Sequence, residues 1–169
     1  MNSFRSSKPR QTTLRVSGLP VARAKAKSSD IVRYAVVGLG HIAQIAVLPA
    51  FAHARRNSRL VALFSDDETK RRELTRRYRI SIAGTYDDFD DFLRRKEIDA
   101  VYIALPNSLH HDFTIRAAKA GVHVLCEKPL ATNVRGCQEM LDACRRHRVK
   151  LMTAYRLHFE KSNLEAIKL

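Results

Sequence analysis

Short apolar runs alternate with amphipathic stretches along the chain from residue 31 onward. The runs have the length and β-branched content of strands and lie at 31–38, 59–65, 80–83, 99–105, 122–126 and 150–155. The stretches between them repeat apolar residues at helical spacing and lie at 42–54, 67–78, 87–96, 107–121 and 134–147, with a last helical pattern from about Ser162. Strict alternation with short links requires right-handed crossovers. The pattern therefore predicts an α/β fold with a doubly wound, mostly parallel sheet.

The helical stretch at 134–147 has an apolar stripe that we expect to be buried. Val134, Cys137, Leu141 and Cys144 recur on it at spacings of three and four. The chain has three cysteines, Cys126, Cys137 and Cys144. They show no C-x-x-C spacing, and their odd number leaves one unpaired in any disulfide scheme. This favours a reduced, cytoplasmic protein.

The net charge of +14 is concentrated in part at the N-terminus. Residues 1–29 contain seven Arg and Lys and no acidic residue, with no sustained apolar pattern, so we expect a disordered basic tail. The tail has no apolar core of a secretory signal, and no run in the chain approaches the length of a membrane span. Charge alone suggests a nucleic-acid binder, but the rest of the chain has no basic recognition helix or aromatic platform, so that class ranks last.

In doubly wound sheets, ligands bind beyond the carboxyl ends of the strands, so the residues just after each run are the candidates. After the first run, Gly38, Gly40 and Ala43 form G-x-G-x-x-A and open a helix. The first glycine permits the tight turn, the second lets a pyrophosphate approach the backbone, and the small third residue lets helix and strand pack closely. The context favours a dinucleotide site over a merely tight glycine turn.

After the second run, the sequence reads SDDETKRR, with mixed signals for the adenosine ribose. Ser65 with Lys70, Arg71 or Arg72 could hold a 2'-phosphate, which favours NADP, whereas the carboxylate of Asp66 suits NAD. The alternative is that the basic residues are a solvated helix face. The balance favours NADP slightly.

The fourth and fifth runs end in further polar groups. His110 and His111 are adjacent, so on a helix they cannot form the i, i+4 pair of a zinc site, and we expect no metal. After the fifth run stand Glu127 and Lys128. A lysine there can bond a substrate hydroxyl and help remove its proton, Glu127 can orient it, and Pro129 can fix the turn, with a cis peptide as one option.

Together the segments VGLGHIA, YIALPNSLHHDFTIRAAKAGVHVLCEKPLAT and KLMTAYRLHFEKSNLEAIKL resemble the glucose-fructose oxidoreductase and inositol dehydrogenase family. The likeness runs from about Ile31 to Leu169, and E-K-P at a strand end is its most specific motif. The resemblance implies an NAD(P)-dependent oxidoreductase with a Rossmann domain and Lys128 as the catalytic residue. It also implies the cofactor-binding residues Gly38, Leu39, Gly40, His41, Ile42, Ser65, Lys70, Leu105, Pro106, Asn107, His110, Glu127, Lys128, Tyr155 and Arg156. Relatives that use NADP have Gly after the serine, where this chain has Asp66.

The resemblance also predicts the domain organisation. We expect a tail at 1–29, an NAD(P)-binding Rossmann domain at 30–160, and at 161–169 the start of a helix leading to a second, α+β substrate domain that is missing here. The function that follows is the nucleotide-binding part of a sugar or polyol oxidoreductase, unable to turn over alone; the alternative is a non-catalytic dinucleotide-binding or interaction module. The expected partners are a sugar or polyol substrate and either a second copy or a complementing C-terminal half, with no specific nucleic acid and no membrane. Leu157, Phe159, Leu164 and Ile167 would be exposed and would favour association.

Overall fold

The computed structural model describes residues 31–168 and contains one six-stranded sheet. The predicted tail at 1–29 lies outside the described residues. The strands are β1 (Val32–Val37), β2 (Ser58–Phe64), β3 (Ile82–Gly84), β4 (Ala100–Ile103), β5 (His123–Cys126) and β6 (Leu151–Thr153). Their order is β3-β2-β1-β4-β5-β6, and every neighbouring pair is parallel, which confirms the doubly wound sheet.

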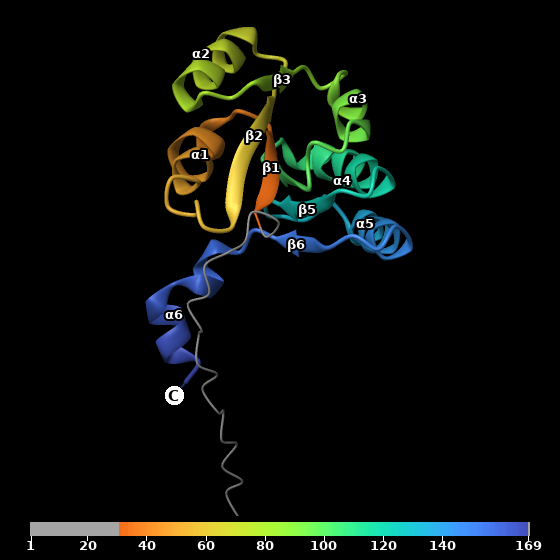
Figure 1. The fold of residues 1–169 in the computed structure, drawn as a ribbon. Helices are drawn as coiled ribbons and strands as arrows, with labels where there is room; N and C mark the ends of the chain where they lie inside the picture. The colour runs from red at the N-terminus through yellow and green to blue at the C-terminus, as the bar shows by residue number, and fades with distance from the viewer. Residues whose placement is uncertain (1–30, 169) are drawn as a thin grey trace, which may run out of the picture.

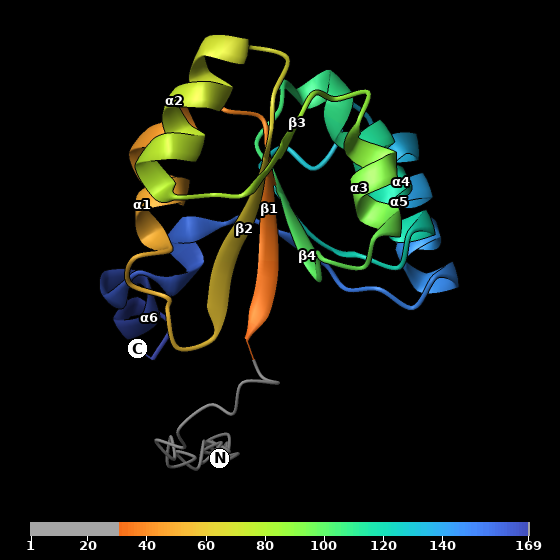
Figure 2. The ribbon, with the colours of Figure 1, turned by 45° about the horizontal axis from the view of Figure 1, so that its top comes forward.

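The helices lie on both faces of the sheet (Figures 1 and 2). One face carries η2 (Ala43–Val47), α1 (Leu48–Ala50) and α2 (Glu68–Tyr78), and the other carries α3 (Phe89–Arg94), α4 (His110–Lys119) and α5 (Val134–Arg146). Short turns η3 (Asn107–Leu109) and η4 (Arg156–Phe159) follow β4 and β6, and α6 (Lys161–Ala166) lies below the sheet in Figure 1. Right-handed crossovers produce this division, because the chain moves outward from β1 in one direction and from β4 in the other.

Two apolar clusters fill the space between sheet and helices. The cluster under α3, α4 and α5 includes Phe64, Phe89 and Phe113, whose rings meet edge to face or tilted. The cluster under α1 and α2 contains Val36 and Leu63. Side chains of successive strand residues point to opposite faces, so β1, β2 and β4 contribute to both clusters. The nearly continuous apolar runs of the sequence follow from this two-sided burial.

The structure differs from the sequence pattern in the first helix. The predicted helix 42–54 ends at Ala50, and its middle widens into a π-helical turn over Ala43–Val47. The side-chain amide of Gln44 donates to the Leu39 carbonyl oxygen at 2.8 Å, which satisfies one group of the preceding loop. Pro49 lies in the last helical turn, close to where we expected it to bend or end the helix.

The predicted inner face of α5 is confirmed at Cys144 and wrong at Val134 and Leu141. The residues that α5 buries are Gly136, Met140 and Cys144, whereas Val134 is 86% exposed and Leu141 36%. The helix is rotated toward its small residue, because a Cβ at Gly136 would lie 3.2 Å from the Cβ of Ala131. Close approach of this backbone sets the stripe that faces the sheet.

Candidate functional site

The strand order reverses between β1 and β4, and the loops after these strands pack directly on each other. Gly38 has a φ of +93°, and a Cβ built there would lie 2.4 Å from the Ala104 carbonyl oxygen. The amide of Ala104 donates to the Val37 carbonyl oxygen at 2.8 Å. Only glycine fits both the conformation and the space. The first glycine of the motif is therefore required by the protein's own packing.

The second glycine is not required by any protein contact. A Cβ at Gly40 would meet nothing within 4 Å, and Gly40, His41 and Ile42 are exposed. The helix that follows starts at His41 and runs to Ala50, with Ala43 fully buried beneath it. The exposed glycine at the start of a helix leaves room for a group that approaches the backbone, as a diphosphate does. This cradle fits a dinucleotide, and Leu39 anchors it as a buried side chain.

The loop after β2 contains the residues that the sequence predicts to meet the adenosine ribose. Ser65 is buried, and its carbonyl oxygen accepts from the Arg71 guanidinium. Lys70 pairs with Asp67 at 2.7 Å, and this bond holds the pKa of the Asp67 carboxyl below its usual value. The Asp66 carboxylate accepts from the backbone amide of Tyr86 at 2.9 Å. Lys70 and Arg71, two of the cations that could hold a 2'-phosphate, therefore already have partners in the protein.

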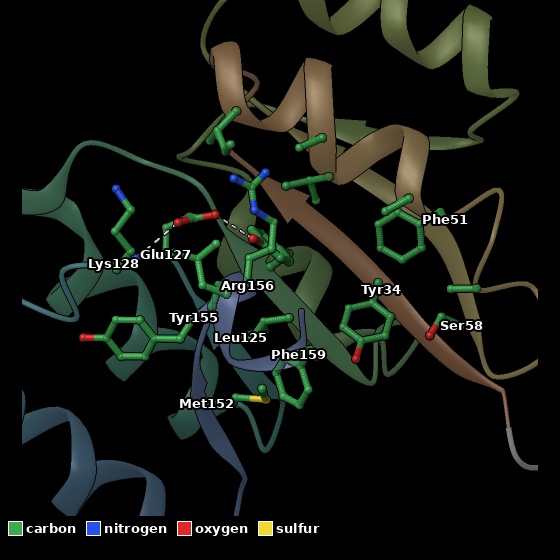
Figure 3. Close-up of a pocket in the computed structure, with 18 residues that line it drawn as sticks. Tyr34, Phe51, Ser58, Leu125, Glu127, Lys128, Met152, Tyr155, Arg156 and Phe159 are labelled. Carbon is green, nitrogen blue, oxygen red and sulfur yellow. Dashed lines mark hydrogen bonds between the residues drawn. The ribbon is translucent and has the colours of Figure 1, made fainter. Parts of the chain in front are cut away.

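The Glu127 carboxylate after β5 is held by groups other than the lysine side chain. Tyr102 on β4 donates its hydroxyl to Glu127 Oε1 at 2.7 Å, and the Lys128 amide donates to Oε2 at 3.2 Å (Figure 3). Burial, and then the bond to this carboxylate, raises the pKa of Tyr102 well above its usual value. Sequence reasoning missed Tyr102, although it pairs with Leu125 in register and so stands on the same face as Glu127.

The lysine itself is available. Lys128 is exposed, and its ammonium group has no ion-pair partner among residues 31–168. In Figure 3 its side chain extends away from the carboxylate of Glu127. The Lys128–Pro129 peptide bond is cis. A free ammonium at this strand end can bind a polar group of a ligand.

A cavity of about 630 Å³ opens beside these residues on the α1 face of the sheet. Its lining includes Ile42, Glu127, Lys128, Tyr155 and Arg156. Further along, the wall is apolar and aromatic and includes Tyr34, Phe51, Leu125, Met152 and Phe159. The structure thus brings Ile42 and the nominated residues after β5 and β6 together around one cavity, whose lining does not include the glycine turn at 38–41.

The nominated residues after β4 divide into exposed and buried groups. Pro106 and Asn107 are exposed, whereas Leu105 is 6% exposed. His110 has no exposed surface, and both of its ring nitrogens face backbone carbonyl oxygens. Asn107 is therefore open to a ligand, while His110 is enclosed.

Residues 31–168 contain neither a metal-binding cluster nor a membrane-spanning helix. Within residues 31–168, no group of three or more His, Cys, Asp or Glu side chains could hold a metal ion. Over the same residues, no helix is long and apolar enough to cross a membrane.

Comparison with known proteins adds an independent finding. Residues 32–155 match the family described as oxidoreductases with an NAD-binding Rossmann fold. An uncharacterized oxidoreductase of Rhizobium meliloti is 42% identical over 116 residues, 69% of this chain and 34% of the relative. A D-xylose 1-dehydrogenase [NADP(+)] of Haloarcula marismortui is 33% identical over 129 residues, 76% of this chain and 36% of the relative.

A solved structure shows the same fold. The aldose-aldose oxidoreductase of Caulobacter crescentus, crystallised with glycerol, superposes with a TM-score of 0.79 at 42% identity, over 82% of this chain and 42% of that one. The chain therefore spans about a third to two fifths of the length of these relatives.

Proposed function

This chain belongs to the oxidoreductase family with an NAD-binding Rossmann fold, and from that membership we propose that it supplies the nucleotide-binding part of an oxidoreductase acting on a sugar or polyol hydroxyl. The observation that carries the proposal is the glycine turn after β1. Gly40 is exposed there, with open space where a side chain would stand, so the glycine is explained by a ligand and not by the fold. The names of the relatives, a xylose dehydrogenase and an aldose oxidoreductase, support the substrate class.

The roles we propose follow the positions around the cavity. A bound nicotinamide supplies the hydride acceptor or donor. In the direction of oxidation, the neutral amine of Lys128 would accept the proton of the substrate hydroxyl and become the ammonium, while the carbon loses hydride and becomes a carbonyl carbon; Asn107 would bind the nicotinamide half. Tyr155 and Arg156 close the site from the loop after β6, which their place on the cavity wall supports. Glu127 supports the site indirectly. Its carboxylate accepts hydrogen bonds from the Tyr102 hydroxyl and the Lys128 amide, and so holds the loop that contains Lys128.

Binding is the direct test. We expect the purified chain to bind NADPH or NADH saturably, measured by nicotinamide fluorescence, and Lys128→Ala to bind with weakened affinity. Absence of saturable binding of both dinucleotides would contradict the proposed function.

For the cofactor, we propose a slight preference for NADP over NAD. Lys70 and Arg71 at the adenosine end support a 2'-phosphate, and Asp66 opposes it. Asp66→Asn removes the charge and keeps an oxygen for the Tyr86 amide. We expect this variant to gain affinity for NADPH relative to NADH. An unchanged ratio of the two dissociation constants would show that Asp66 does not influence the choice of cofactor.

The alternative is a module that binds a dinucleotide without turnover. The chain matches 34% and 36% of the length of the two curated relatives. Hydride transfer needs the substrate held in reactive geometry. We propose that the chain alone binds cofactor without appreciable turnover. Assays with aldoses and NADP(H) test this, and turnover at a useful rate would overturn it.

The proposed partners are a second copy or a complementing C-terminal half. Exposed apolar side chains support this, because Leu157, Phe159, Leu164 and Ile167 are 41% to 71% exposed. The domain boundaries after residues 29 and 160 stay predictions. So does the cytoplasmic location, which the free thiols of Cys126, Cys137 and Cys144 support.

A further inference from the structure

The most enclosed polar side chain near the candidate site is His110, the first residue of α4. It has no exposed surface. Its Nδ1 lies 2.8 Å from the Pro129 carbonyl oxygen, and its Nε2 lies 2.9 Å from the Leu105 carbonyl oxygen. A side chain without exposed surface cannot touch a ligand in the crevice. Whatever His110 contributes to the site must pass through these two carbonyl groups.

The two carbonyl groups belong to the loops after β4 and β5. The sheet joins these loops last at the Glu127 amide, which donates to the Ile103 carbonyl oxygen at 3.0 Å. The imidazole bridges them two residues further along each chain, from 103 to 105 and from 127 to 129. In the loop after β5, Lys128 lies between the sheet bond at Glu127 and the imidazole contact at Pro129. In the loop after β4, Asn107 follows the contact at Leu105 by two positions.

The chemistry of the ring makes the bridge a bonded one. A carbonyl oxygen can only accept, and an imidazole carries at least one N–H in each of its protonation states. At least one of the two contacts is therefore an N–H···O=C hydrogen bond, and both are in the imidazolium. In a buried position such a bond is costly to remove, because the carbonyl is left without a donor.

We propose that His110 is a positioning residue that fastens the loop after β4 to the loop after β5. It thereby fixes the separation of Asn107 and Lys128. The proposal rests on the proposed function in one respect, that these loops hold the nicotinamide half of the cofactor. The fastening itself is a property of the chain without ligand and can be tested separately.

The first experiment measures amide hydrogen exchange in the cofactor-free chain. His110→Phe keeps the ring volume and removes both donors. We expect the amides of Glu127, Lys128 and Leu130 to exchange on the order of tenfold faster, the factor that corresponds to one hydrogen bond. His110→Gln restores one donor and should recover part of the protection.

Two variants of the same helix are the controls. Thr114→Val lies one turn further along, is equally buried, and removes a hydroxyl that lies beside the Cys126 thiol and bonds to neither of the two loop carbonyls. It should leave exchange in the loop unchanged. Phe113→Leu removes the ring that packs on Tyr86 and Phe89, and should accelerate exchange across the sheet instead of in the loop alone.

The second experiment measures the dissociation constant for NADPH in the same variants. We expect about a tenfold increase for His110→Phe, a smaller one for His110→Gln and none for Thr114→Val. Equal loop exchange in His110→Phe and Thr114→Val would overturn the proposal, and so would acceleration spread across the chain as in Phe113→Leu. If the wild-type chain binds neither dinucleotide, the proposed function fails, but the exchange experiment still decides the role of His110.

Discussion

At the scale of single residues, the structure gives different physical reasons for the presence of glycine at two positions, 38 and 40. Gly38 has positive φ and no room for a Cβ, whereas Gly40 faces open space. The sequence motif predicted both positions but could not separate their reasons. The distinction needs the distance from Gly38 to the loop after β4, which is set by strands that are not neighbours in the sequence.

Substituting each glycine by alanine should therefore give opposite results. Gly38→Ala should lower the free energy of unfolding by about 2 kcal/mol or more, because strain and overlap add. Gly40→Ala should change it by no more than about 0.5 kcal/mol, as exposed substitutions do, while weakening dinucleotide binding. Urea unfolding and fluorescence titration of both variants test this. Equal destabilisation by the two changes would contradict it.

The pair of Arg33 and Asp99 should give a pH-dependent contribution to stability. The guanidinium donates to both carboxylate oxygens, at 2.9 and 2.7 Å, and lowers the pKa of Asp99 below its usual value. A lowered folded-state pKa gives stability that is present above the unfolded value near 4 and is lost as pH falls through the folded value.

Asp99→Asn should therefore be less stable than the wild type at neutral pH, by no more than about 1 kcal/mol since water screens the partly exposed pair. The difference should shrink below about pH 4. Unfolding in urea at several pH values measures it. A difference that stays constant down to pH 3 would show that the charge of Asp99 is not its cause.

At the scale of elements, the period of a helix predicts that one face is buried but not always which face. In α5 two apolar stripes overlap at Cys144, one through Val134 and Leu141 and one through Gly136 and Met140. An apolar pattern assigns no weight to a glycine within a helix, although the close approach of Gly136 to Ala131 decides the rotation.

Met140→Ala should accordingly destabilise the protein by roughly 2–5 kcal/mol, the cost of deleting a fully buried side chain. Val134→Ala, on the exposed stripe, should cost less than about 0.5 kcal/mol. Chemical unfolding of the two variants compares them directly. Similar losses would indicate that the helix is rotated otherwise in solution.

The strands and their order were predictable, because parallel crossovers leave few arrangements. The partners of Glu127 were not predicted. The sequence places it beside Lys128, but the pleat directs its carboxylate toward Tyr102, 25 positions earlier on the neighbouring strand. Side chains of adjacent strand residues point to opposite faces. Sequence proximity therefore suggested the wrong partner for the Glu127 carboxylate, whereas the register of β4 and β5 indicates Tyr102.

At the scale of the whole molecule, the α1 face of the sheet is covered less completely than the other. Over β4 to β6 it carries the cavity, and Met152, Tyr155, Leu157 and Phe159 are 46% to 62% exposed there. Contiguous apolar surface of this kind favours association.

We expect the chain to associate as its concentration rises, measured by size exclusion at several concentrations. Leu157→Ser with Phe159→Ser should shift it toward the monomer. Val134→Ser is the matched control, because it removes an exposed apolar side chain outside the cavity. A monomer at every concentration would contradict the expectation.

The pairing of β1 with β4 also determines when the molecule can work. These strands lie side by side at the centre of the sheet, yet Arg33 and Asp99, which join their starts, are 66 positions apart. Such a distant contact closes slowly, because the chain between must first be ordered or looped out. The contact between Gly38 and Ala104 does not form until these strands pair. During synthesis, then, a nascent chain shorter than about a hundred residues has the glycine turn but no pocket, and a dinucleotide can act as a ligand only of the completed sheet, which it then protects from unfolding.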